Sequence, residues 1–368
     1  MIPWELPGQE HAIAALSSAF AQEDYGHAWA FIGPKGVGQE RAARLFAAVT
    51  NGAVSDTGQL DRFLRGTHPA ITTFTPIGAN HRKRDVSESW LPAANQTLIE
   101  GKVKVLHIHE ADRMNMEAAN AFLKTLEEPP AGTVWILDIA NEQSIPDTIL
   151  SRCRRVRFSP WRAEHLATLI PDHPDQALLI ALSEGAPDKV AALASSVALG
   201  EYRQARTWVP DMLDRGPGMA MMATHALKGA IKRRSDAIEA EGKAAIAQLH
   251  EAYEKAPPTL VKHIDTQYKR LVRAERTATI QDALDACLGY LRDVIAVATN
   301  TEAPLRNVDA RDRLIGDSTR ISVTAAISIS DRIQQTRDAL EVNVAWELAI
   351  QALLLQAHTD CIVHRVGQ

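Results

Sequence analysis

The sequence predicts an α/β amino-terminal part built on a parallel sheet, followed by an all-helical carboxyl-terminal part. Three observations support this fold class. A strand pattern, a glycine-rich loop and a helical pattern follow one another over residues 28–49. Apolar runs typical of buried strands then alternate with helical patterns up to about residue 158, as in parallel sheets. From Trp161 onward, helical periodicity dominates.

Length and composition describe a globular protein. The 368 residues are enough for about two or three domains, and the net charge of −5 excludes a surface that binds nucleic acid over its whole extent. Cys153, Cys287 and Cys361 lie far apart and show no metal-ligand spacing. We therefore expect a cytoplasmic protein with reduced cysteines and no metal site, and neither a secretory leader nor a membrane-spanning segment.

The first elements lead into the glycine-rich loop. Apolar residues at helical spacing predict a helix over residues 8–22, and an apolar strand is expected over residues 28–32. The loop itself reads GPKGVG, residues 33–38, and the helical pattern of residues 41–49 follows it. This order of strand, loop and helix is that of a phosphate-binding P-loop.

The loop keeps the glycines of a P-loop, Gly33, Gly36 and Gly38, and changes its chemistry. A P-loop has Lys and then Ser or Thr after the last glycine, because an ammonium neutralises the phosphates and a hydroxyl binds Mg²⁺. Here Gln39 brings no charge, and the carboxylate of Glu40 would repel phosphate. The pattern indicates a loop that keeps the backbone shape of a P-loop but lacks the groups that bind phosphate and Mg²⁺. Taken alone, a simple tight turn explains these glycines as well.

Residues 51–95 are expected to be irregular with short elements, because glycines and prolines interrupt every long period. The basic run of residues 81–84 is either a solvated loop or a binding site, and its composition favours the solvated loop. The sequence does not indicate a role for this segment.

A strand is expected over residues 102–109, where nucleotide-binding proteins carry their second motif. In an active ATPase this strand ends in two acidic residues, one that binds Mg²⁺ and a Glu that polarises the attacking water. Here the pair is His109 and Glu110. Neutral imidazole is a poor ligand for Mg²⁺, so Glu110 would be a base without a metal beside it. Asn115 is expected to cap the next helix, residues 116–127.

The remaining elements are predicted from the same signals. A buried strand is expected over residues 133–140, and residues 146–150 lead to Arg152; by itself it would be an ordinary surface or helix-end arginine. Residues 208–218, rich in Pro and Gly, are the best linker candidate. Long helices are expected over three ranges, 219–249, 259–298 and 330–358. Their basic residues are interpreted as solvated faces. Trp346, Ile350 and Leu354, spaced by four, form either an assembly stripe or part of the core.

Three runs together resemble the bacterial clamp-loader ATPase family: HAWAFIGPKGVG at residues 27–38, EADRMNMEAANAFLKTLEEPP at residues 110–130 and TILSRC at residues 148–153. The combination of LEEPP with SRC is specific, whereas the P-loop alone is not. The resemblance implies an AAA+ module with a RecA-like domain over residues 1–160 and a helical lid over residues 161–207. A helical collar over residues 208–368 would join subunits into a five-membered ring.

The resemblance also implies a function and partners. In this family, gamma or tau subunits hydrolyse ATP and a delta subunit opens the sliding clamp on primed DNA. Gln39, Glu40 and His109 indicate a member without ATPase activity or catalytic residues in cis, and ATP would be bound by the partner subunits. Asp188 agrees, because it stands near the place where active relatives carry a phosphate-sensing arginine. One difference from the family pattern counts against the resemblance: residues 51–95 contain no cysteine, whereas many relatives carry a four-cysteine zinc module there.

By resemblance, Arg152 has a chemical role. The arginine of the SRC motif points across a subunit interface at the γ-phosphate of the neighbour's ATP, where a planar cation offsets developing charge. Two other hypotheses remain at this stage. One is an ATP-hydrolysing AAA+ motor, either a gamma/tau-like loader subunit or a helicase subunit. The other is a DNA-binding scaffold that uses the basic residues of the collar.

Overall fold

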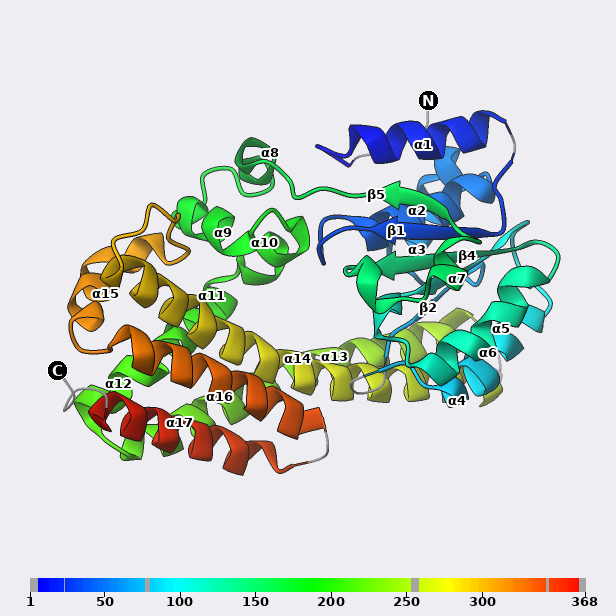
Figure 1. The fold of residues 1–368 in the computed structure, drawn as a ribbon. Helices are drawn as coiled ribbons and strands as arrows, with labels where there is room; N and C mark the ends of the chain where they lie inside the picture. Colours follow the sequence, from blue (N-terminus) through cyan, green and yellow to red (C-terminus); the bar gives the residue numbers. More distant parts are fainter. Residues whose placement is uncertain (1–5, 23, 77–79, 253–257, 342–343, 364–368) are drawn as a thin grey trace. The chain divides into compact units, whose positions relative to one another are not determined.

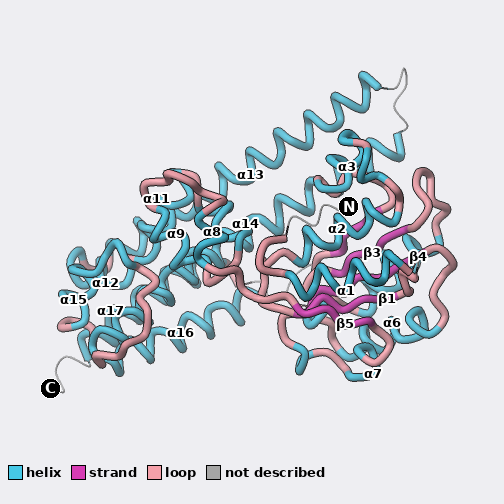
Figure 2. Tube along the Cα trace, turned by 90° about the horizontal axis from the view of Figure 1, so that it is seen from above, coloured by secondary structure: helices cyan, strands magenta, loops and turns pink. Residues whose placement is uncertain are grey.

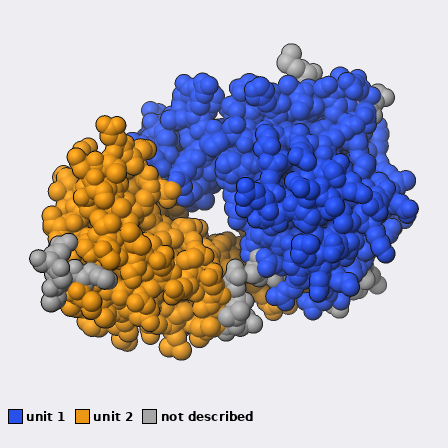
Figure 3. Space-filling view, viewed as in Figure 1, with its two compact units in different colours: residues 1–192 blue, residues 193–368 orange. Residues whose placement is uncertain are grey.

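The computed structural model describes residues 6–22, 24–76, 80–252, 258–341 and 344–363. The chain forms two compact units, residues 1–192 and residues 193–368, which Figure 3 shows in two colours. The three-domain division expected from the sequence stays a prediction. Within the described residues, no helix is long and apolar enough to cross a membrane.

The first unit contains five strands and a series of mostly short helices (Figure 1). The strands are β1 (Ala28–Ile32), β2 (Ile71–Phe74), β3 (Lys104–Ile108), β4 (Thr133–Ile139) and β5 (Arg154–Arg157). The helices are α1 (Glu10–Ala21), α2 (Gln39–Thr50), α3 (Thr57–Leu64), α4 (Lys83–Asp85), α5 (Leu91–Asn95), α6 (Met116–Glu127), α7 (Asp147–Leu150), α8 (Ala163–Ala167), α9 (Gln176–Ser183) and α10 (Pro187–Leu193). Short 3₁₀ or π turns cover Ala53–Ser55, Val86–Trp90, Ala111–Arg113 and Glu142–Ser144.

The five strands form one parallel sheet in the order β2-β3-β4-β1-β5. The parallel α/β prediction for this unit is therefore confirmed. All residues of β1, β3 and β4 are buried, as expected for strands covered by helices on both faces. Because β1 lies between β4 and β5 in a parallel sheet, the loop after it stands at the carboxyl edge of the sheet, next to the end of β4.

Helices cover both faces of this sheet, as Figure 2 shows for α2 and α6. On one face, alternate strand residues such as Leu106 and Leu137 share a core with Phe122 of α6. On the other face, Trp29 of β1 meets Phe46 of α2, with ring centroids 5.7 Å apart. Side chains of β3 and β4 that alternate with the α6 core therefore point toward the α2 side.

Several local signals act as predicted. Asn115 caps α6, since its side chain accepts a hydrogen bond from the backbone N–H of Ala118 at 2.8 Å. The basic run of residues 81–84 is only partly solvated. Arg82, Lys83 and Arg84 are exposed, as expected for a solvated loop, whereas His81 is buried. Its Nε2 lies 2.8 Å from the backbone oxygen of His109, so His81 supports the end of β3 from below the surface.

The second unit is helical, which confirms the all-α prediction for the carboxyl-terminal part. Its helices are α11 (Ser196–Arg206), α12 (Trp208–Arg215), α13 (Gly218–Ala252), α14 (Pro258–Ala298), α15 (Arg311–Ser318), α16 (Val323–Glu341) and α17 (Trp346–Val363), with a 3₁₀ turn at Val308–Ala310. The predicted linker at residues 208–218 is wrong. Residues 208–215 form α12, and its Trp208 and Met212 are buried in the core of this unit.

The predicted helix over residues 330–358 is divided in the structure between α16 and α17, and residues 342–343 lie outside the described residues. Ile350 and Leu354 are 0% and 1% exposed within the core of this unit, and Trp346 packs against that core. Of the two interpretations of this stripe, the structure supports the intradomain core. Periodicity shows which face of a helix is apolar and cannot show what covers it.

Candidate functional site

The glycine-rich loop after β1 has the backbone that its sequence predicts. Gly36 and Gly38 have φ values of +75° and +116°, in the region that favours glycine. A Cβ atom on Gly33 would lie 2.4 Å from the backbone oxygen of Phe158, so a larger residue cannot fit there. Val37 is buried, and its backbone oxygen accepts a hydrogen bond of 2.9 Å from the Trp161 ring nitrogen. These contacts fix the loop to the chain that leaves β5.

Gln39 occupies the position of the P-loop lysine and points back into the loop. Its side chain is buried, and Nε2 donates hydrogen bonds to the backbone oxygens of Gly33 at 2.9 Å and Pro34 at 2.8 Å. The amide thus satisfies carbonyl groups of its own loop. It supplies no positive charge to the space that phosphates occupy in an active P-loop.

The charged groups around this loop are paired with one another. Glu40, at the position of the Mg²⁺-binding hydroxyl, forms an ion pair with Arg44 one turn along α2. Lys35 crosses from the loop to Glu110, with 2.5 Å between Nζ and Oε1, and Arg113 contacts the other Glu110 oxygen at 2.5 Å. Burial alone would raise the pKa of Glu110, but these two cations lower it to about 2. Glu110 is therefore an ionised partner of two cations and a very weak base.

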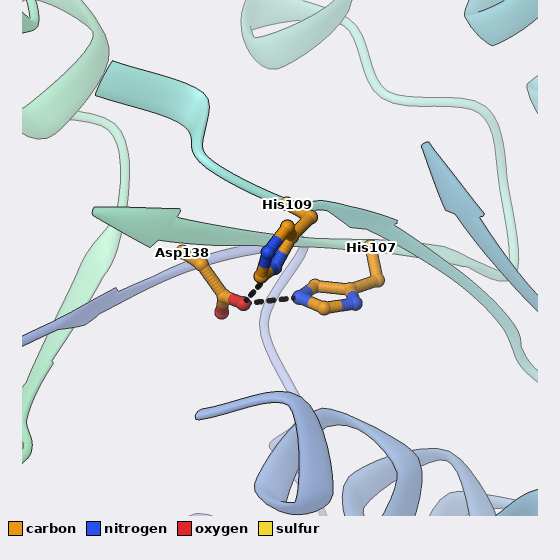
Figure 4. A group of neighbouring side chains, drawn as sticks. All are labelled: His107, His109 and Asp138. Carbon is orange, nitrogen blue, oxygen red and sulfur yellow. Dashed lines mark hydrogen bonds and ion pairs between the residues drawn. The ribbon is translucent and has the colours of Figure 1, made fainter. Parts of the chain in front are cut away.

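His109 lies at the end of β3 and contacts Asp138 of β4, as Figure 4 shows. His109 Nδ1 is 3.1 Å from Asp138 Oδ2, and Nε2 of His107 is 2.8 Å from the same oxygen. Burial would raise the pKa of Asp138, yet the two imidazoles hold it below its usual value. Burial would lower the pKa of His109, yet the hydrogen bond to Asp138 raises it.

These residues line a small cavity at the carboxyl edge of the sheet. Its volume is about 30 Å³, close to the share of one water molecule in liquid water. A nucleotide needs a far larger space, since ligand pockets are typically about 300–1,000 Å³. Five carboxylates line it, on Glu40, Glu110, Asp112, Asp138 and Asp188.

Asp188 stands at the beginning of α10, beside the loop. Its backbone N–H donates to the oxygen of Gly36 at 3.3 Å. Its side chain is exposed, yet the pKa is raised, because the carboxylate loses hydration next to the loop and faces Glu40. Asp188 therefore lies close to a second carboxylate, that of Glu40.

Arg152 lies in the turn between α7 and β5. Its guanidinium donates to the backbone oxygen of Thr148 and to the Glu127 carboxylate, both at 2.8 Å, and its side chain is 36% exposed. The neighbouring Cys153 is mostly buried, which raises the pKa of its thiol to about 12. Among the SRC residues, Arg152 therefore carries the accessible charged group.

Most of the site residues predicted around the loop lie together in the structure. The cavity is lined by Gly33, Gly36, Gln39, Glu40, His109, Glu110 and Asp188. Gly38 forms the left-handed N-cap of α2, and Arg152 belongs to a separate turn. Sequence reasoning missed Lys35, His107 and Asp138. The alternation His107-x-His109 and the single acid within the apolar run of β4 were signals for the last two.

The match to a family model lies within the first unit. A family model described as "DNA polymerase III, delta subunit" matches residues 8–162. The chain is 34% identical over 188 residues to the DNA polymerase III subunit delta' of Pseudomonas aeruginosa, a match that covers 47% of this chain and 57% of that protein. Over these residues the chain is similar to subunits of the DNA polymerase III clamp loader. The family resemblance seen in the sequence is confirmed at this level.

The type of clamp-loader subunit is not decided by similarity. The chain is also 31% identical over 175 residues to the DNA polymerase III subunit tau of Bacillus subtilis, covering 42% of this chain and 28% of that protein. Among solved structures, a gamma subunit-related protein from Thermotoga maritima aligns at 16% identity and a TM-score of 0.45, over 95% of this chain and 99% of that one. The matched part of the chain spans 28% and 57% of the length of the tau and delta' relatives, respectively.

Proposed function

We propose that this chain is the delta-prime-type subunit of the clamp loader, a member that neither binds Mg·ATP productively nor hydrolyses it. The observation that carries the proposal is the position of Gln39. Where an active P-loop directs an ammonium at the β- and γ-phosphates, the Gln39 amide is bonded to the loop's own carbonyls. Gln39 and Glu40 replace the lysine and the hydroxyl that phosphoryl transfer needs, and Lys35, the remaining cation of the loop, is paired with Glu110.

Electrostatics support the same conclusion. ATP would bring several negative charges into a cavity lined by five carboxylates. Lys35 lines the same cavity, but its ammonium is already paired with Glu110. A phosphate group would have to compete with this ion pair and approach Glu40 and Asp188 at unfavourable energy. His109, in the place of the Mg²⁺-binding carboxylate, is engaged by Asp138.

The proposed role gives Arg152 a partner outside this chain. We propose that the guanidinium acts in trans on ATP bound by a neighbouring gamma or tau subunit. Its planar, permanently charged group suits a γ-phosphate, and it lies at the surface with one carboxylate to release, Glu127. The partners in this proposal are the gamma/tau and delta subunits and, through the assembled complex, the sliding clamp and primed DNA. The second unit would serve as the collar.

Three basic residues of the long helices, Arg233, Arg234 and Lys269, are paired within the unit and so do not support the DNA-scaffold hypothesis. Arg234 of α13 contacts Glu201, Glu275 and Asp282, at distances of 3.1, 3.3 and 2.9 Å. Arg233 contacts Glu201 at 2.7 Å, and Lys269 of α14 contacts Asp265 at 2.7 Å. These cations are neutralised within the unit, whereas a groove for phosphates presents unpaired cations.

Titration calorimetry with Mg·ATP on the purified chain, together with a steady-state ATPase assay, tests the proposal. We expect no turnover and no saturable binding at micromolar nucleotide. A gamma or tau subunit assayed in parallel is the positive control. Co-elution of this chain with gamma/tau and delta subunits tests the assembly role separately.

The second candidate function is an ATP-hydrolysing motor of the gamma/tau type, favoured by the 31% identity with subunit tau. Micromolar binding of Mg·ATP with steady turnover would establish that function and exclude ours. In that case Lys35 would have to leave Glu110, so a Lys35→Met variant should then change nucleotide affinity strongly.

A further inference from the structure

We propose that His107, His109 and Asp138 form a binding site for a transition-metal ion of the Zn²⁺ class at the carboxyl edge of the sheet. The proposal rests on the geometry of β3 and β4 alone, so it does not depend on the clamp-loader function. It also departs from the sequence-based expectation of no metal site, which considered only cysteine spacing and the Mg²⁺ position.

The three side chains converge because of strand geometry. His107 and His109 are two residues apart along β3 and its extension, so both point to the same face of the sheet. In the parallel pairing of β3 with β4, Ile108 lies beside Leu137, which places Asp138 next to the two histidines. One ligand atom from each residue lies within 4.8 Å of the others. Figure 4 shows both imidazoles directed at the same carboxylate oxygen.

The distances suit a coordinated ion. Two donors that each lie about 2.0–2.1 Å from Zn²⁺ at a tetrahedral angle are about 3.3 Å apart. The observed separations from Asp138 Oδ2 are 2.8 Å to His107 Nε2 and 3.1 Å to His109 Nδ1. For the two contacts with Asp138, a movement of a few tenths of an ångström would therefore reach the separation expected in a coordinated ion.

Two buried atoms of the cluster lack hydrogen bonds to the described residues. His107 is fully buried, and its Nε2 has no hydrogen-bond partner among the described residues, only the ion-pair contact of 2.8 Å with Asp138. Asp138 is 6% exposed, and its Oδ1 also has no hydrogen-bond partner among the described residues. Buried polar atoms of this kind are costly unless something else satisfies them. An ion held by His107 Nε2 and the Asp138 carboxylate would do so.

The surroundings resemble those of a metal site that keeps one position open. Thr73 Oγ1 lies 3.4 Å from Nδ1 of His107, where a second contact can fix the ring and its tautomer. His109 is partly exposed and lines the cavity of about 30 Å³, which has room for a water molecule as a fourth ligand. Two imidazoles and one carboxylate favour Zn²⁺ and similar ions over Mg²⁺, which prefers oxygen ligands and keeps its own waters.

The test uses the untagged full-length chain, freed of metal by chelation and dialysis. Calorimetry with Zn²⁺ should give one strong site per chain, and Mg²⁺ should give none. His109→Ala and Asp138→Asn should each weaken Zn²⁺ binding by at least about 100-fold, since even loss of a supporting contact typically costs 10–100-fold. His27→Ala, which removes an exposed histidine outside the cluster, should keep the wild-type affinity.

Circular dichroism of each variant checks that it folds. If the ligand variants do not fold, the wild-type chain loaded with Co²⁺ still decides, because X-ray absorption counts its imidazole ligands. Two imidazoles and an open coordination position are expected. No Zn²⁺ binding, equal affinity in wild type and both ligand variants, or fewer than two imidazoles on Co²⁺ would each overturn the proposal.

Discussion

The glycine-rich loop after β1 and the turn that carries Arg152 lie at opposite edges of one sheet and use their polar groups in opposite ways. At the loop, Gln39 bonds to its own backbone and Lys35 to Glu110. At the turn, Arg152 remains partly exposed and contacts an exposed carboxylate. The comparison shows that polar groups at one edge of a sheet can be satisfied within the chain, while a charged group at the other edge stays accessible to solvent.

The largest expected effect comes from Arg152→Ala. If the arginine acts in trans, clamp loading and DNA-stimulated ATPase of a reconstituted complex should fall, although less than the roughly 10³–10⁵-fold loss seen when such an arginine is removed from a single-site enzyme. Arg152→Lys should fail as well, because it keeps the charge without the planar fork. The melting temperature should barely change, since an exposed ion pair contributes about 0–1 kcal/mol.

Arg157→Ala is the matched control for this experiment. Arg157 lies at the other end of β5, is exposed and pairs with Glu142, so the variant removes the same charge and a comparable ion pair away from the Arg152 turn. We expect it to load clamps normally. Normal loading by Arg152→Ala would mean that the two regions do not differ in function, and that Arg152 is an ordinary surface residue.

A smaller effect, on stability alone, is expected for Gln39→Ala. The change leaves the backbone oxygens of Gly33 and Pro34 without the amide, at a cost of about 1–3 kcal/mol. For a unit of this size, each 1 kcal/mol lowers the melting temperature by about 2–4 °C. Calorimetric melting measures it, with Gln143→Ala, an exposed glutamine, as the control. An unchanged melting temperature would show that the loop does not depend on Gln39.

The smallest expected effect is on the pH dependence of stability and comes from Glu100. It shows how much an exposed ion pair, such as that of Arg152 and Glu127, contributes to the free energy of unfolding. Hydrogen bonds from Arg62 and then Gln59 lower the pKa of Glu100 to about 2. Because the folded pKa lies below the unfolded one, the stabilisation is present above about pH 4.5 and is lost as the pH falls toward 2. Solvent screening limits it to below about 1 kcal/mol.

Urea unfolding of wild type and Glu100→Gln at pH 7 and pH 3 measures this contribution. The wild type should lose slightly more stability between the two pH values than the variant does. An equal loss in both proteins would mean that the ion pair with Arg62 contributes nothing, and that Glu127 can be expected to release Arg152 without cost.

Local signals in the sequence were sufficient for most of the fold and for part of the site. Glycine spacing predicted the loop, and Asn115 predicted the start of α6. Partners distant in sequence could not be predicted. The ion pair of Lys35 with Glu110 joins residues 75 positions apart, and the approach of Asp138 to His109 depends on strand order. The apolar stripe containing Ile350 was visible, but its burial inside the unit was not.

The contacts of the glycine-rich loop have a further consequence for how such motifs are read. Gly33 fits against the backbone of Phe158, and the oxygen of Val37 receives the Trp161 ring nitrogen. Gln9, just before α1, bonds to both the oxygen and the N–H of Ser159, and so joins the amino terminus of the unit to the same place. The loop is a joint at which three segments of the chain meet. The close approach of Phe158 requires glycine at position 33 whether or not the loop binds a nucleotide. The glycines of such a motif can therefore indicate tight packing of the chain as well as ATP binding.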